Sequence, residues 1–96
     1  MLDPSADPRG MPRQAAVSIA VVDDNADMRD YLVRVLSGCG RIRAYPDGEE
    51  AWRLAREHLP DLVLLDVMMP GMSGWEVCRK IREDVALAHT GVVMLT

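Results

Sequence analysis

The chain has 96 residues, of which 49% are hydrophobic and 27% are charged, and its formal net charge is −4. A chain of this length forms one domain with its own core, and a second domain does not fit. The acidic balance argues against direct nucleic-acid binding, because a phosphate backbone is bound by clustered Lys and Arg side chains. No window approaches the roughly 18 apolar residues of a membrane span, and no leader pattern opens the chain. We therefore expect a cytoplasmic protein that contacts neither nucleic acid nor membrane.

Residues 1–16 carry three prolines among Asp, Ser, Arg and Gly, and they offer almost nothing to bury. We predict a flexible tail or linker there and a domain over 17–96. The domain opens with an apolar run over 19–22, which is typical of a buried strand. This run ends in two acids, Asp23 and Asp24.

The first helix is predicted over 26–37. Asn25 is a candidate N-cap, and Gly38 follows the last helical residue. The apolar residues that recur at helical spacing, and that we expect to face the core, are Met28, Leu32, Val35 and Leu36.

An edge strand and a second helix are predicted next. The segment 41–45 alternates polar and apolar residues, and its arginines would discourage pairing with a further strand, so we place it at an edge of the sheet. Asp47 and Glu50 form a capping-box pattern at the start of the second helix, and Pro60 closes that helix.

The stretch over 62–74 combines a predicted strand, an acid, a turn and the start of a helix. Four consecutive apolar residues predict a strand covered on both faces, and the run stops at Asp66. A Pro-Gly pair then forces a turn, and Ser73 with Glu76 is a second capping box. Asp66 therefore follows a buried strand at its carboxyl end, where open α/β sheets place their ligands.

A third helix and a last strand complete the chain. The apolar run over 92–95 predicts the strand, and Thr96 follows it. The apolar face of the third helix is marked by Val77, Cys78, Ile81 and Val85.

Strands and helices thus alternate as β-α-β-α-β-α-β, a pattern that predicts an α/β fold with a doubly wound parallel sheet. The carboxyl ends of parallel strands lie along one edge of the sheet. If the three apolar runs are inner strands, four polar residues meet at that edge: Asp23, Asp24, Asp66 and Thr96.

Three carboxylates at one edge would repel one another unless a cation lies between them. A hard divalent ion with oxygen ligands suits such a site, and Mg²⁺ binds through one or two carboxylates together with water and phosphate. With the metal in place, one carboxylate can act as a nucleophile and form an aspartyl phosphate. The residues therefore indicate Mg²⁺-assisted phosphoryl transfer.

The chain resembles the receiver domain of bacterial two-component response regulators over about 17–96. The resemblance is carried by the acid pair after the first strand, by Asp-Val-Met-Met-Pro-Gly-Met-Ser-Gly, and by Thr96 after Val-Val-Met-Leu. It implies a flavodoxin-like fold with strand order 2-1-3-4-5. It also implies that Asp66 is the phosphoacceptor, that Asp23, Asp24 and the backbone carbonyl of Met68 help hold Mg²⁺, and that Thr96 is the switch hydroxyl.

The same resemblance implies a signalling domain that catalyses only its own phosphoryl transfer and hydrolysis. Its phosphodonor would be a sensor histidine kinase or a phosphotransfer protein. Receivers continue beyond the switch hydroxyl into a fifth strand that ends in a Lys and into further helices, whereas this sequence ends at Thr96. The order expected here is therefore 2-1-3-4, and no residue is assigned the role of that Lys.

Other interpretations of these residues stay open. Asp23 or Asp24 could simply complement the dipole of the first helix. The domain could be a receiver-like interaction module that phosphate does not regulate, or a small Mg²⁺-dependent phosphatase of another α/β family, although Met68 stands where such an enzyme has a second acid. We also expect self-association through the exposed edge of the strand over 92–95.

Overall fold

The structure of the protein, a computed structural model, describes residues 17–95. The predicted tail over 1–16 and the predicted switch residue Thr96 lie outside the described residues.

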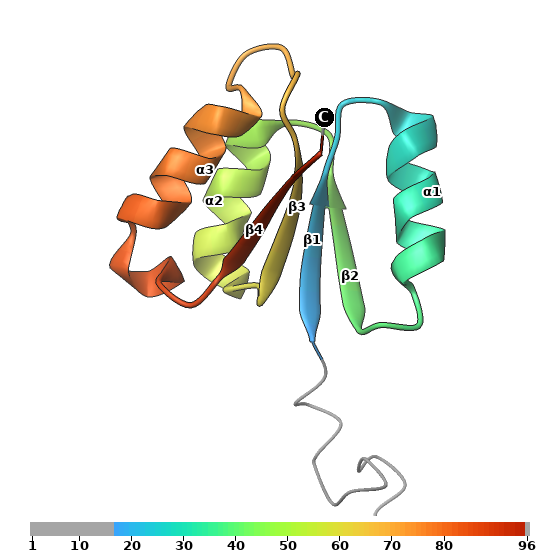
Figure 1. Cartoon of the computed structure of the whole chain (residues 1–96), viewed down its shortest axis with the longest axis horizontal. Helices are drawn as coiled ribbons and strands as arrows, with labels where there is room; N and C mark the ends of the chain where they lie inside the picture. Colours follow the sequence, from blue (N-terminus) through green and yellow to red (C-terminus); the bar gives the residue numbers. More distant parts are fainter. Residues whose placement is uncertain (1–16, 96) are drawn as a thin grey trace, which may run out of the picture.

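Four parallel strands form one sheet in the order β2-β1-β3-β4 (Figure 1). This arrangement confirms the predicted doubly wound α/β fold with strand order 2-1-3-4, and it places β2 and β4 at the two edges. Along the chain the elements are β1 (Ser18–Val22), α1 (Ala26–Leu36), β2 (Arg41–Tyr45), α2 (Gly48–His58), β3 (Leu62–Asp66), α3 (Gly74–Glu83), the 3₁₀ helix η2 (Val85–Leu87) and β4 (Gly91–Leu95).

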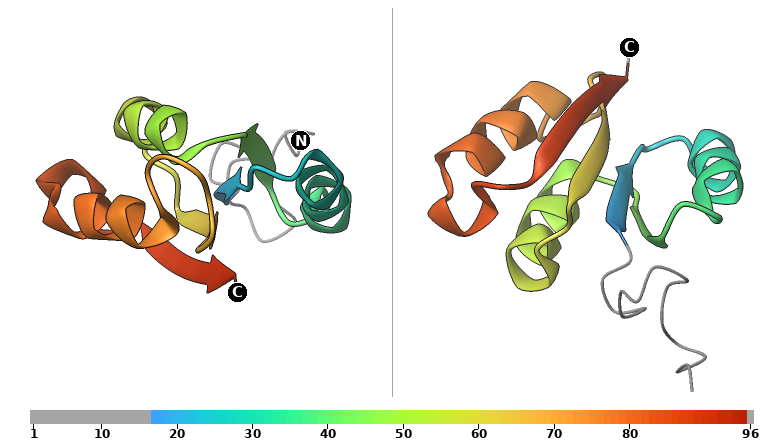
Figure 2. Two further views of the ribbon diagram at one scale, coloured as in Figure 1. Left: turned by 90° about the horizontal axis from the view of Figure 1, so that it is seen from above. Right: turned by 60° about the horizontal axis from the view of Figure 1, so that its bottom comes forward.

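Helices cover both faces of the sheet. The views in Figure 2 place α1 on one face and α2 with α3 on the other. Because side chains alternate along a strand, β1 sends Ala20 and Val22 into the core under α2 and α3 and Ile19 and Val21 toward the opposite face. All four side chains are at most 3% exposed, so β1 is covered on both faces as its apolar run predicted.

The predicted helix starts are confirmed by their caps. The side chains of Asn25, Asp47 and Ser73 each accept a hydrogen bond from the backbone N–H three residues further on. These bonds satisfy amides that a helix leaves without an internal partner, and they fix the point at which each helix leaves its loop.

The residues predicted to face the core from α1 and α3 were wrong in part. Met28 and Val35 of α1 are 47% and 56% exposed, so they do not face the core, and α1 buries none of its residues fully. The third helix ends at Glu83 and does not include Val85, which is 90% exposed. The cause is Asp84, whose extended backbone stops α3 and whose side chain accepts from the Ala86 N–H to cap η2.

The edge strand β4 packs Val92 and Met94 against the core, whereas Val93 lies on the opposite face of the sheet. None of its five residues is buried, and Val93 is 44% exposed. Of the helices in residues 17–95, none combines the length and the apolar character that a membrane span requires.

Gly74, the first residue of α3, lies directly against the end of β3. A Cβ atom at this position would clash first with the carbonyl oxygen of Asp66 and would lie 2.9 Å from the Cα atom of Val67. The Gly74 N–H also donates to the Val67 carbonyl at 3.1 Å. The absence of a side chain at Gly74 therefore lets α3 approach the backbone that carries Asp66.

We predict that Gly74→Ala lowers the free energy of unfolding by about 1–3 kcal/mol, because the added methyl group must push the backbone of β3 away from α3. Chemical denaturation measures this change. Gly38→Ala is the matched control, since a Cβ atom at Gly38 would have no neighbour within 4 Å. Equal stability of the two variants would contradict the close packing of α3 on Asp66.

Candidate metal and phosphoryl-transfer site

The parallel pairing of β1 with β3 brings two of the predicted acids together. Val22 of β1 is in register with Leu65 of β3. Asp23 follows Val22 in the sequence, and Asp66 follows Leu65. Asp24 follows in the loop that leads to α1. The site thus lies at the carboxyl edge of the sheet, between the two central strands.

The three acids form a compact cluster. One carboxylate oxygen from each of Asp23, Asp24 and Asp66 lies within 4.8 Å of the others. Asp23 is buried with 5% of its surface exposed, Asp66 is half-buried and Asp24 is exposed. Within residues 17–95 this is the one group of three or more His, Cys, Asp or Glu side chains with that spacing.

Asp23 is held from several directions. Its N–H donates to the Tyr45 carbonyl at 3.2 Å, a bond that joins the end of β1 to the end of β2. Its Oδ1 accepts from the Asn25 N–H at 2.9 Å, and its carbonyl accepts from Nη1 of Arg29 at 2.8 Å. These bonds involve the backbone and Oδ1, and none of the hydrogen bonds among the described residues is made to Oδ2.

Asp66 is held in a similar way at the end of β3. Its Oδ1 accepts from the Met68 N–H at 3.1 Å, which leaves the second carboxylate oxygen for another partner. The Val67 N–H donates to the Leu95 carbonyl at 3.1 Å and ties the following residue to β4. Each acid thus uses its Oδ1 to fix the loop that follows it, and one oxygen of each carboxylate lies in the cluster.

Among residues 17–95, no Lys or Arg side chain forms an ion pair with any of the three acids. Within the described part of the chain the ion pair present joins Arg56 to Asp84 at 3.0 Å, on the α2–α3 side of the molecule. The amino terminus of α1, capped by Asn25, is adjacent to the acids and favours negative charge. One carboxylate oxygen from each of three acids at this spacing fits the hard oxygen donors that Mg²⁺ requires.

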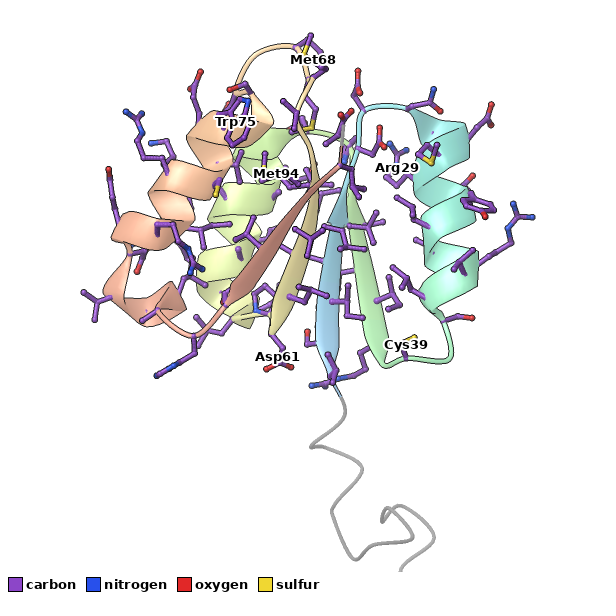
Figure 3. The ribbon with its side chains drawn as sticks, viewed as in Figure 1. Arg29, Cys39, Asp61, Met68, Trp75 and Met94 are labelled. Atoms are coloured by element: carbon purple, nitrogen blue, oxygen red, sulfur yellow. The ribbon has the colours of Figure 1, made fainter. Side chains whose placement is uncertain are left out.

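The structure brings together three of the five residues predicted for the site, Asp23, Asp24 and Asp66. Met68 lies beside them in the β3–α3 loop, with its N–H bonded to Asp66 and its side chain 80% exposed (Figure 3). Thr96 lies outside the described residues, but its neighbour Leu95 pairs with Asp66 in the sheet register.

Arg29 was not among the residues predicted for the site. Its position in the sequence could have indicated its role. Helical side chains lean toward the amino terminus of their helix, so a long side chain one turn after the N-cap can reach back to the preceding loop. Arg29 is four residues after Asn25, which is this position.

The family model described as the response regulator receiver domain matches residues 19–96. Among curated proteins, the DNA-binding response regulator MtrA of Mycobacterium tuberculosis is 48% identical over 79 residues, which is 81% of this chain and 33% of MtrA. The chain spans about a third or less of the length of the curated relatives it matches.

The solved structures that this chain resembles are also receiver domains. The N-terminal domain of a response regulator receiver protein from Methanoculleus marisnigri is 41% identical with a TM-score of 0.78, and the match covers 82% of this chain and 65% of that one. The receiver domain of the histidine kinase CKI1 from Arabidopsis thaliana, complexed with Mg²⁺ and BeF3⁻, is 27% identical with a TM-score of 0.74. That match covers 81% of this chain and 64% of the CKI1 chain.

The family match extends over most of the chain, and the strand order and the acids at the carboxyl edge of the sheet agree with it. This chain therefore belongs to the family of response regulator receiver domains, the signalling domains of two-component systems.

Proposed function

We propose that this receiver domain takes a phosphoryl group onto Asp66 from a histidine of a sensor kinase or of a phosphotransfer protein. Mg²⁺ is held by the carboxylates of Asp23, Asp24 and Asp66 and by the backbone carbonyl of Met68. The observation that carries the proposal is the convergence of three carboxylate oxygens within 4.8 Å at the carboxyl edge of the sheet.

Asp66 suits the role of nucleophile better than its neighbours. Asp23 is 5% exposed and is fixed by three hydrogen bonds, so a donor protein cannot reach it. Asp24 is exposed and has no anchor among the described hydrogen bonds that would orient it for attack. Asp66 is half-buried, it ends a central strand, and its Oδ1 is oriented by the Met68 N–H.

The transfer step follows from these positions. A carboxylate oxygen of Asp66 attacks the phosphorus atom of the phosphohistidine in line with the phosphorus–nitrogen bond. That bond breaks, the imidazole keeps the electron pair and takes a proton from solvent, and an acyl phosphate remains on Asp66. The protein mainly positions the groups and balances charge, because phosphoryl transfer asks little covalent chemistry of the other residues.

The remaining residues hold the site for this step. Bound Mg²⁺ supplies positive charge against the phosphoryl oxygens and offsets the repulsion among the carboxylates. The CKI1 receiver domain, which was solved with Mg²⁺ and BeF3⁻, supports this assignment by analogy. We assign the switch hydroxyl to Thr96, because it follows Leu95, the residue paired with Asp66.

The first prediction concerns metal binding. Mg²⁺ should raise the melting temperature, and it stabilises the fold by about 2.7 kcal/mol when its concentration is about 100 times its dissociation constant. Asp24→Asn should raise the melting temperature in the absence of divalent ions, since one of three like charges is gone, and should abolish most of the response to Mg²⁺.

The control for this experiment is Asp30→Asn, which removes an exposed acid of α1 outside the cluster and should leave the Mg²⁺ response unchanged. Thermal melts at low salt, where charge repulsion is least screened, give the clearest difference. A melting curve that does not respond to millimolar Mg²⁺ would show that the three acids do not form a metal site.

The second prediction concerns the nucleophile. Incubation with Mg²⁺ and a small phosphodonor such as acetyl phosphate should add one phosphate, and the adduct should be labile to base, as acyl phosphates are. Intact-mass spectrometry should find no adduct on Asp66→Asn, whereas the Asp30→Asn control should be labelled like the unmodified protein.

An adduct that persists on Asp66→Asn would move the phosphoacceptor to another residue. A protein that binds Mg²⁺ but accepts no phosphate from either a small donor or a phosphorylated histidine kinase would instead be an interaction module that phosphate does not regulate.

A further inference from the structure

Arg29 lies beside the acidic cluster but bonds to the main chain rather than to a carboxylate. Its Nη1 donates to the Asp23 carbonyl at 2.8 Å, and its side chain is half-buried. Figure 3 shows it between α1 and the carboxyl end of β1. No ion pair in residues 17–95 joins Arg29 to any of the three acids. The guanidinium therefore leaves the carboxylate oxygens open to another cation.

The bond from Arg29 completes a three-point attachment of Asp23. The Asp23 N–H is fixed by the Tyr45 carbonyl of β2, its Oδ1 by the Asn25 N–H at the start of α1, and its carbonyl by Arg29 within α1. The first attachment belongs to the sheet and the other two belong to α1. Arg29 thus couples the position of the helix to the backbone of the most buried acid in the cluster.

Arg29 can influence a bound cation in two opposite ways. By fixing the Asp23 carbonyl it holds the carboxylate in one orientation, which strengthens metal binding. By its positive charge it repels the metal ion, which weakens binding. Removal of the Arg29 side chain should therefore weaken metal binding if the orienting effect is larger, and strengthen it if the charge repulsion is larger.

The burial of Asp23 decides which effect is larger. With Arg29 in place Asp23 is 5% exposed, so its carbonyl depends on the guanidinium rather than on bulk water for this hydrogen bond, and loss of the donor frees the β1–α1 loop to move. The charge of Arg29, in contrast, is on a half-buried side chain that solvent screens in part. Groups that orient the ligands of a metal commonly change its affinity by about 10- to 100-fold.

We propose that Arg29 is a positioning residue of the acidic cluster: its bond to the Asp23 carbonyl orients the Asp23 carboxylate for Mg²⁺. The inference rests on the proposed Mg²⁺ site and adds a residue that the site did not include. Arg29 touches neither the phosphoryl group nor the metal in this role, and it acts through Asp23 alone.

The test is the dissociation constant for Mg²⁺, measured by calorimetry on Arg29→Met, which keeps the aliphatic stem and removes the charge and the donor. We expect binding about 10-fold weaker than in the unmodified protein. Arg34→Met is the matched control, because Arg34 is an exposed residue of the same helix that makes no side-chain bond to Asp23. Arg29→Lys, which restores a charged donor, should recover part of the affinity.

A second measurement separates positioning from a general loss of structure. The rate of phosphorylation of Arg29→Met should return to that of the unmodified protein when Mg²⁺ is raised to saturation. Without any metal, the Asn25 amide, which donates to Asp23, should exchange with solvent severalfold faster in Arg29→Met. A rate that stays low at saturating Mg²⁺ would contradict a positioning role.

Mg²⁺ binding that is unchanged or tighter in Arg29→Met would overturn the proposal and show that the charge of Arg29 is the larger effect. Should Arg29→Met not fold, Arg29→Gln takes its place, and tighter binding there would likewise overturn it. If the unmodified protein binds no Mg²⁺, the proposed function fails, and the exchange rate of the Asn25 amide still decides whether Arg29 holds the loop.

Discussion

The parallel register of β1 with β3 is the constraint on which the site depends. Val22 pairs with Leu65, so the residues that follow them, Asp23 and Asp66, are two acids on neighbouring strands. A shift of one residue in either strand would exchange its side chains between the two faces of the sheet, where the packing partners differ, and would also separate the acids. Packing of the core and assembly of the cluster are therefore specified by the same pairing.

This arrangement places three negative charges close together, and hydrogen bonds from the surrounding structure hold two of the acids in place against their repulsion. The sheet and the start of α1 hold Asp23 through backbone and side-chain hydrogen bonds, and the β3–α3 loop holds Asp66 in the same manner. Gly74 allows α3 to pack against the backbone of Asp66. With these hydrogen bonds in place, one oxygen of each carboxylate lies within 4.8 Å of the others, so the proposed binding of a cation would need little rearrangement.

Most of the fold and the core of the site could be predicted from the sequence, because both follow from local patterns. Apolar runs that stop at an acid fix the ends of the central strands, and capping residues fix the helix starts. The end of α3 and the exposure of Val85 could not be predicted, because they depend on how Asp84 bonds within its own loop. Arg29 was missed because its partner is a backbone carbonyl: its position one turn after Asn25 indicated that it could reach the preceding loop, but no residue type there marked the acceptor.

The carboxyl edge of β1 and β3 is proposed to form one divalent-ion site. Amide NMR with Mn²⁺ in place of Mg²⁺ tests it directly, since a paramagnetic ion broadens the signals of nearby residues. Substoichiometric Mn²⁺ should broaden the amides of Asp23, Asp66 and Met68 and spare those of Ser18 and Asp61, an acid-bearing pair at the opposite edge of the sheet. Broadening centred on Asp61, or spread evenly over the exposed acids, would contradict the account.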